Sequence, residues 1–359
     1  MSHSPSSSLP EAPVHEPAIT RLAESGHLPD ALLRAGIRRL CARRLRDELA
    51  GDADIVWERQ RERLQSLRGS AIALETDAAN RQHYELPPAF FRLCLGRHLK
   101  YSSAYWDDAT PNLDAAEERM LSLYGERGGL ADGQRILELG CGWGSLTLWM
   151  AARYPHARIT AVSNSRPQRE YILARCRERG LDNVEILTCD VNRLQLQEGA
   201  YDRVVSIEMF EHMRNYAQLL DRIGSWLAPG GKLFVHIFCH RDLLYPFETD
   251  GQDDWMGRYF FTGGLMPAAD TLLHFQDALS LEQRWLLSGT HYRRTADAWL
   301  ANQDRHREQV LAILESAYGA DQARLWHQRW RMFWMACAEL FGYDDGREWM
   351  VAHYRFSRR

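Results

Sequence analysis

The chain of 359 residues lacks the features that mark several large protein classes. Its seven cysteines lie far apart, with no CxxC pair and no Cys/His cluster of zinc spacing, so neither a disulfide scaffold nor a zinc site is expected. No apolar run approaches a transmembrane span, and residues 1–16, rich in Ser, Pro and His, lack the apolar core of a signal peptide. We therefore expect a cytoplasmic protein with reduced thiols, no metal and a disordered tail over residues 1–16.

The chain also lacks an excess of positive charge, because its formal net charge is −4. Bulk attraction for nucleic acid is therefore not expected. One region is locally basic: from Ala18 to about Asp77 the pattern is helical, with an apolar face and arginines around it. The apolar face comprises Leu33, Ile37, Leu40, Cys41 and Leu45, and the arginines are Arg34, Arg38, Arg39, Arg43, Arg44 and Arg46. We favour a solvated face packed against its own domain, with peripheral contact to an anionic membrane as the alternative.

Alternating glycines follow an apolar stretch at Ile136-Leu-Glu-Leu-Gly-Cys-Gly-Trp-Gly144, and a helical pattern begins at Ser145. Gly140 and Gly142 remove side chains where the backbone must turn and approach a ligand, and Glu138 adds a carboxylate just before them. The third glycine of a dinucleotide-binding GxGxxG loop is missing. The spacing resembles the acidic-residue-GxGxG loop of S-adenosylmethionine (SAM) dependent methyltransferases, with a tight turn that binds nothing as the alternative.

Strand and helix patterns alternate from about residue 124, which predicts a doubly wound α/β sheet. Strands are expected at 135–139, 158–163, 184–189, 203–207, 232–238 and near 348–356, and helices near 145–153, 166–179, 215–227, 296–318 and 321–341. The aromatic segment 247–275 interrupts this alternation, as a substrate lid would. We divide the chain into the tail 1–16, a helical region and cofactor cover at 17–122, the core at 123–240, a lid insertion at 241–283, and a completing segment at 284–359.

Ligands of open α/β sheets lie at the carboxyl ends of the strands, so the residues there are expected to form one cleft. The second strand ends at Ser163-Asn164 and leads to Gln168, whose hydroxyl and amide groups replace the usual acidic ribose ligand. The third ends near Asp190 and Val191. A carboxylate at 190 could accept the exocyclic amine of adenine, although a turn cap explains Asp190 equally well. Ile207 ends the fourth strand.

Three polar residues follow the fourth strand in Ser206-Ile-Glu-Met-Phe-Glu-His-Met213. If Glu208 opens a helical turn, Glu211 and His212 share its face. Two carboxylates and an imidazole at a cofactor cleft can orient a cationic amine and remove its proton, which the nitrogen needs before it can attack a methyl group. The alternative is the polar first turn of a surface helix. An Asn/Asp-Pro-Pro-Tyr sequence, which would indicate methylation of nucleic acid bases, is absent here.

Longer motifs carry a family resemblance that runs from about residue 18 to the end. His83-Tyr-Glu-Leu-Pro87, Tyr101-Ser-Ser-Ala-Tyr-Trp106, the Cys-Gly-Trp-Gly loop and His291-Tyr-x-x-Thr295 resemble the cyclopropane fatty acid synthase superfamily of SAM-dependent enzymes. Within it, Ser206–Met213, Asp253-Asp-Trp-x-x-Arg-Tyr-Phe-Phe-Thr-Gly-Gly264 and Ala-Glu-Leu-Phe-Gly-Tyr343 resemble the coclaurine N-methyltransferase family. The resemblance implies a class I SAM-methyltransferase (Rossmann-like) fold with a seven-stranded sheet, an N-terminal helical extension and a substrate-covering insertion after the fifth strand.

The resemblance also implies a role for each matching residue. Tyr101 and Ser102 close over the cofactor, Gly140 and Gly142 cradle its methionine part, Asn164 and Gln168 hold the ribose region, and Asp190 and Val191 hold adenine. Glu208, Glu211 and His212 are catalytic, and Phe261, Trp330 and Phe333 line an aromatic substrate pocket, with core packing as the alternative for these aromatics. Arg329 stands where the family has a tyrosine, which places the detailed substrate preference in doubt.

Lipid-modifying relatives in this superfamily hold a bicarbonate base between a cysteine, a glutamate, a histidine and a tyrosine, beside a small glycine. Glu211, His236 and Tyr292 match three of these ligands, but Ser103 replaces the cysteine and Glu208 the glycine. A second carboxylate would repel the anion, which favours methyl transfer to an amine.

We therefore predict a SAM-dependent N-methyltransferase acting on a small aromatic or alkaloid-like amine, with His212 as base, Glu208 anchoring the amine and Glu211 orienting either group. The alternatives are modification of unsaturated phospholipid chains and noncatalytic SAM binding. The sequence is compatible with either a monomer or a homodimer.

Overall fold

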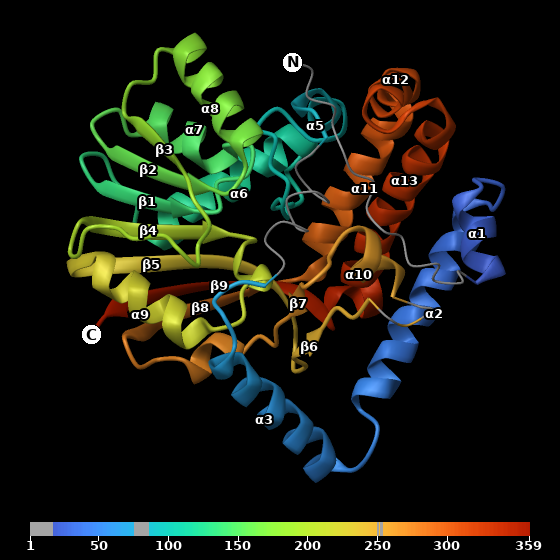
Figure 1. Ribbon diagram of the computed structural model, residues 1–359, viewed down its shortest axis with the longest axis horizontal. Helices are drawn as coiled ribbons and strands as arrows, with labels where there is room; N and C mark the ends of the chain where they lie inside the picture. Colours follow the sequence, from blue (N-terminus) through green and yellow to red (C-terminus); the bar gives the residue numbers. More distant parts are fainter. Residues whose placement is uncertain (1–16, 75–85, 250, 252–253) are drawn as a thin grey trace, which may run out of the picture.

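The computed structural model describes residues 17–74, 86–249, 251 and 254–359 (Figure 1). The predicted tail over residues 1–16 lies outside these ranges, as do motif residues 83–85 and Asp253.

A seven-stranded sheet forms the centre of the fold, in the order β3-β2-β1-β4-β5-β9-β8. Its strands are β1 (Arg135–Leu139), β2 (Arg158–Ser163), β3 (Val184–Thr188), β4 (Tyr201–Ile207), β5 (Leu227–His240), β8 (Leu279–Leu287) and β9 (Trp349–Arg358). The first five run parallel, and β9 lies between β5 and β8, antiparallel to both. The predicted class I methyltransferase fold is confirmed, and the strand order reverses between β1 and β4, where open α/β sheets bind ligands.

Helices cover both faces of the sheet, which explains why its strands are apolar on both sides (Figure 1). Ile136 belongs to one hydrophobic cluster with residues of α6 (Leu113–Gly128) and α7 (Ser145–Arg153). Its neighbour Leu137 points the opposite way, into a second cluster with residues of α9 (Tyr216–Trp226). Helix α8 (Arg166–Arg179) packs on β2 and β3.

Helices from the N-terminal and C-terminal regions of the chain pack together beside the sheet (Figure 1). The helices α1 (Ala18–Glu24), α2 (Asp30–Glu48) and α3 (Ala53–Gly69) come from the N-terminal region, and α5 is Pro88–Cys94. The C-terminal helices are α11 (Gly289–Arg305), α12 (Arg307–Tyr318) and α13 (Ala320–Gly342). Helix α2 packs against α13, and the buried pair Glu24–Arg329 joins α1 to α13 at 2.8 Å. Arg34 and Arg38 both contact the carboxylate of Glu339.

Two details of the helical regions differ from the sequence prediction. The segment 296–318 is two helices separated at His306, whose Nδ1 lies 3.0 Å from the carbonyl oxygens of Leu93 and Asn302. Leu40 was predicted on the apolar face of α2 but is 45% exposed. The packed row is Leu33, Ile37, Cys41 and Leu45, spaced by four residues, and Leu40 lies beside this narrow row.

The insertion between β5 and β8 contains β6 (Tyr245–Pro246), α10 (Trp255–Tyr259), β7 (Leu265–Met266) and the 3₁₀ turn η2 (Thr271–His274). Strand β8 begins at Leu279, so the part outside the main sheet ends earlier than the expected boundary at residue 283. The Trp255 indole donates to Glu24, which connects α10 to α1. The insertion is thus connected to α1 and, through Glu24, to α13.

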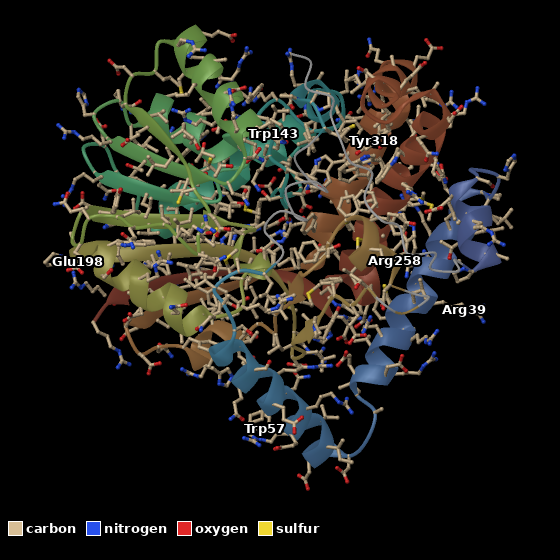
Figure 2. The ribbon with its side chains drawn as sticks, viewed as in Figure 1. Arg39, Trp57, Trp143, Glu198, Arg258 and Tyr318 are labelled. Atoms are coloured by element: carbon tan, nitrogen blue, oxygen red, sulfur yellow. The ribbon has the colours of Figure 1, made fainter. Side chains whose placement is uncertain are left out.

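The arm formed by α2 and α3 carries side chains that point away from the body. Arg39 and Trp57 lie on its outer side in Figure 2, and Trp57 is 62% exposed. Within the described part of the chain, none of the helices is long and apolar enough to span a bilayer. Contact of this arm with a membrane surface stays a prediction.

Candidate active site

Three cavities meet at the carboxyl end of β4. The first lies between the glycine loop, residues 140–144, and the ends of β2 and β3. The second lies between the glycine loop and residues 99–102, and the third lies between α11, α13 and the insertion. Glu208, directly after β4, lines all three and is alone in doing so among the described residues. Its φ of 45° lies in the left-handed region, a strained conformation for a non-glycine residue that is typical of functional sites.

The glycine loop separates the first two cavities and lines both. Gly140 and Gly142 have φ values of 77° and 51°, which L side chains rarely adopt. A methyl group on Gly140 would lie 2.8 Å from Cβ of Met209, whereas one on Gly142 would meet no atom within 4 Å. The loop is therefore packed against the protein at 140 and open toward the cavities at 142.

Several buried polar atoms at these two cavities have no hydrogen-bond partner among the described residues. They are Gln168 Nε2 at the first cavity and Trp143 Nε1 and Ser145 Oγ at the second. Buried donors are rarely left unpaired, so their position in residues that line a cavity indicates a polar ligand. Together with the open space at Gly142, they fit the ribose and amino-acid portions of SAM, the cofactor that the sequence predicts.

The structure brings most of the predicted cofactor residues to these cavities. Gly140, Gly142, Ser163, Asn164, Gln168 and Val191 line the first, and Tyr101, Ser102, Glu138 and Ile207 line the second. Asp190 does not line either one, although Cys189 and Val191 beside it line the first. Its Oδ1 accepts the N–H of Asn192 at 2.7 Å, as the turn-cap alternative expects. The adenine-binding role of Asp190 stays a prediction.

Glu138 is a buried carboxyl group at the second cavity. It accepts the hydroxyl of Thr147 at 2.6 Å, and burial raises the pKa of Glu138 to about 8. Because the folded-state pKa lies above the ordinary value of 4.5, the stabilisation from this group is present below pH 4.5 and is lost as pH rises through 8.

Glu138→Gln is therefore expected to change stability in a pH-dependent way. Glutamine keeps the shape and the acceptor for Thr147 but cannot ionise, so the cofactor-free variant should exceed the parent in free energy of unfolding by about 2–4 kcal/mol at pH 9. Near pH 5 the gap should largely close. Urea unfolding at both pH values measures this, with exposed Glu170→Gln as the control. An equal difference at both pH values would contradict the role of burial.

Glu208 is held by hydrogen-bond donors on both of its oxygens. Oε1 accepts the backbone N–H of Ser103 at 2.9 Å and lies 3.0 Å from Nε2 of His236, and Oε2 accepts the hydroxyl of Tyr292 at 2.7 Å. Burial raises the pKa of Glu208 above its ordinary value, and the Lys100 ammonium together with the Ser103 and Tyr292 donors opposes that rise. These partners favour a carboxylate that is oriented and ionised.

Glu211 and His212 lie in the 3₁₀ turn η1 (Phe210–His212) rather than in a helical turn opened by Glu208. Both nevertheless line the third cavity with Glu208. Glu211 is fully buried, and neither of its oxygens has a hydrogen-bond partner in the part of the chain that the structure describes. Burial, and then the charge of Glu208, raises the pKa of Glu211 well above its ordinary value. The two carboxyl groups therefore differ. Glu208 accepts hydrogen bonds from protein donors, whereas Glu211 has no hydrogen-bond partner among the described residues.

Aromatic and aliphatic side chains form the rest of the third cavity, which has about 680 Å³ of empty space including solvent at its mouth, a typical small-molecule size. Phe261, Phe333 and Tyr292 line it as predicted, and the His212 ring lies 4.7 Å from that of Phe261. His236 and Trp330 are not among the lining residues. His236 lies behind Glu208, and Trp330 is fully buried against Phe90 and Phe260, which is the core-packing alternative.

Three contributors to the site were missed by sequence reasoning. Lys100 is fully buried, donates to the Ser103 carbonyl at 2.6 Å and also contacts the Ser102 hydroxyl. Burial lowers the pKa of Lys100 to about 8. Its position next to Tyr101 was the available signal. Tyr124 and His353 gave none, because only the folded backbone brings them to His236.

Comparisons with known proteins agree with this geometry. The family model for mycolic acid cyclopropane synthetase matches residues 73–347. An (S)-coclaurine N-methyltransferase of Thalictrum flavum subsp. glaucum is 38% identical over 344 residues, covering 94% of each chain. A cyclopropane-fatty-acyl-phospholipid synthase of Escherichia coli (strain K12) is 31% identical over 77% of this chain and 67% of its own.

Among solved structures, a coclaurine N-methyltransferase bound to N-methylheliamine and S-adenosylhomocysteine superposes with a TM-score of 0.91 at 37% identity, covering 95% of this chain and all of the other. The chain belongs to the mycolic acid cyclopropane synthetase family of SAM-dependent methyltransferases and, within it, to the coclaurine N-methyltransferase group.

Proposed function

We propose that this protein transfers the methyl group of SAM to the nitrogen of a small aromatic amine of the benzylisoquinoline or tetrahydroisoquinoline type. The observation that carries the proposal is the position of Glu208, a residue that lines both cofactor-side cavities and the aromatic cavity. A cationic amine held by this carboxylate lies where the cofactor and acceptor spaces meet. The similarity to (S)-coclaurine N-methyltransferases and to a structure holding N-methylheliamine supports the acceptor class.

When bound, SAM supplies an electrophilic methyl group on a sulfonium and leaves as S-adenosylhomocysteine. The residues of the chain prepare the nitrogen. Glu208 anchors the protonated amine, and the aromatic walls at Phe261 and Phe333 receive its ring and exclude water. His212, which lines both the first and the third cavities, takes the proton so that the nitrogen exposes its lone pair. Glu211 orients the amine or the imidazole.

The arrangement of Glu208 also bears on the lipid alternative. His236 and Tyr292, two of the residues that match bicarbonate ligands in lipid-modifying relatives, have their hydrogen bonds directed to the Glu208 carboxylate. A protein carboxylate thus takes the donors that an external anion would need, and a second negative charge there is unfavourable in a buried site.

An assay with methyl-labelled SAM distinguishes the candidates. The purified protein is expected to add one methyl mass to a benzylisoquinoline or a phenethylamine and to release one S-adenosylhomocysteine per product. Phospholipid vesicles with unsaturated chains and added bicarbonate are the control. Label in the acyl chains without any labelled amine would support the lipid enzyme instead, and cofactor binding without S-adenosylhomocysteine release on either acceptor would support the noncatalytic alternative.

A further inference from the structure

A row of polar side chains crosses the sheet from Glu208 toward the half-buried Arg127. The register of the strands creates it: Ile207 of β4 is paired with His236 of β5, and His236 is paired with His353 of β9. Residues paired in register point to the same face. The next position across is Trp285 of β8, over which the Arg127 guanidinium stacks at 5.1 Å.

The side chains of this row form one continuous hydrogen-bonded chain. Arg127 lies 2.8 Å from Nδ1 of His353, Nε2 of His353 lies 2.9 Å from Nδ1 of His236, and Nε2 of His236 lies 3.0 Å from Oε1 of Glu208. Both histidines are fully buried. Burial lowers the pKa of each well below its ordinary value, and the charges of Lys100 and Arg127 lower it further, which favours the neutral form of both rings.

Arginine sets the direction of every hydrogen bond in this chain, because a guanidinium can only donate. Nδ1 of His353 must accept, so the proton of that neutral ring is on Nε2. Nδ1 of His236 must then accept from His353, which places the proton of His236 on Nε2, facing Glu208. The Tyr124 hydroxyl lies 2.9 Å from the same Nδ1 of His236, and because a hydroxyl can either donate or accept, it is compatible with both tautomers of this ring.

We propose that Arg127 and His353 are positioning residues for methyl transfer: through His236 they fix both ring tautomers so that a proton donor always faces Glu208, which keeps this carboxylate ionised and oriented toward the amine. This inference rests on the proposed role of Glu208. Without the arginine the chain can reverse, with Nδ1–H of His236 donating to His353 and Nε2 of His236 accepting from a protonated Glu208. The reversed chain stabilises the neutral acid, which cannot anchor a cation.

The other groups that face this chain do not fix its direction. Glu208 is also faced by Lys100, Tyr124, Tyr292, Glu211 and Cys337, whose electrostatic interactions with it are shared by any tautomer of His236. His353 is faced by Arg127, His236, Tyr124 and Lys100, and of these the arginine alone contacts its Nδ1 among the described residues.

Arg127→Met and Arg127→Lys form a matched pair, since both lose the guanidinium stack on Trp285 but only lysine keeps a donor. For Arg127→Met, kcat/KM for the amine should fall about fivefold at pH 7 and recover toward the parental value above pH 9, because the pKa of Glu208, about 7 in the parent, moves up by about one pH unit and with it the acid side of the pH profile. Arg127→Lys should keep most of the parental pH dependence of kcat/KM on the acid side of the profile. Affinity for S-adenosylhomocysteine and the thermal midpoint serve as folding controls.

Imidazole ¹⁵N spectra of the cofactor-free protein test the tautomers directly. In the parent, His236 and His353 should both be Nε2–H tautomers from pH 6 to 9, with assignments from His353→Gln and His236→Gln. Arg127→Met should give a tautomer mixture at both rings. Unchanged tautomers together with an unchanged acid side of the pH profile would overturn the proposal. If the protein methylated no amine, the spectra would still decide the tautomer claim, so failure of the proposed function is distinguishable.

Discussion

Glu208→Gln is expected to lower kcat for the preferred amine by roughly 10²–10⁴-fold while cofactor binding persists. The amide fits the same space: its oxygen can accept from Ser103 and His236, and its NH₂ group can donate to the Tyr292 oxygen. The variant therefore removes the charge and leaves the packing. Steady-state methylation measured beside S-adenosylhomocysteine affinity separates catalysis from binding.

Two controls separate charge from hydrogen bonding and anchoring from proton transfer. Tyr292→Phe removes one donor but keeps the carboxylate, so its loss in kcat should be much smaller than that of Glu208→Gln. His212→Ala should lose activity near neutral pH and regain part of it as pH rises and the amine loses its proton in solution. Parental turnover in both Glu208→Gln and His212→Ala, with the cofactor still bound, would rule out the assigned roles.

The glycine loop gives a second prediction with a large effect. Gly140→Ala should reduce the free energy of unfolding by about 2–4 kcal/mol, since it adds a left-handed alanine and a methyl group 2.8 Å from Met209. Gly142→Ala should cost only about 1–2 kcal/mol, because its methyl group meets no protein atom.

At Gly142 the expected loss of cofactor affinity is large, although the expected loss of stability is small. Its added methyl group enters the space shared by the two cofactor-side cavities, so S-adenosylhomocysteine binding should weaken by about a hundredfold or more although the fold is nearly intact. Chemical unfolding and calorimetric titration of both variants provide the comparison. Tight binding by Gly142→Ala would place the cofactor elsewhere.

Local patterns in the sequence were enough to predict the sheet and the residues at its strand ends. Parallel strands buried on both faces read as apolar runs, and their carboxyl ends share one edge, so the sequence positions of Ser163, Gln168 and Glu208 sufficed to assign them to one cleft. The helix break at His306 could not be predicted, since neither glycine nor proline marks it and a tertiary contact to Leu93 accompanies it.

The roles of residues whose position depends on strand register or on competing packing could also not be predicted from the sequence. His353 follows His236 by 117 residues and meets it only because β9 inserts beside β5. Trp330 is an aromatic residue of the kind that lines substrate pockets. Helix α13 carries aromatic side chains on several faces, however, and the sequence does not say which of these faces borders the cavity. For Asp190 the sequence could not show that its Oδ1 accepts the N–H of Asn192, because that hydrogen bond depends on the backbone conformation of the turn.

The insertion of β9 between β5 and β8 has a consequence for how this protein is made. The glycine loop and the first five strands leave the ribosome long before residues 349–358. A nascent chain can therefore begin to form the cofactor-side part of the sheet while β5 is paired with β4 but not yet with β9. His353 arrives with that final strand, and the pairing of Glu24 with Arg329 spans 305 residues. The hydrogen-bonded chain that ends at Glu208 and the packing of α1 on α13 are therefore completed last during synthesis.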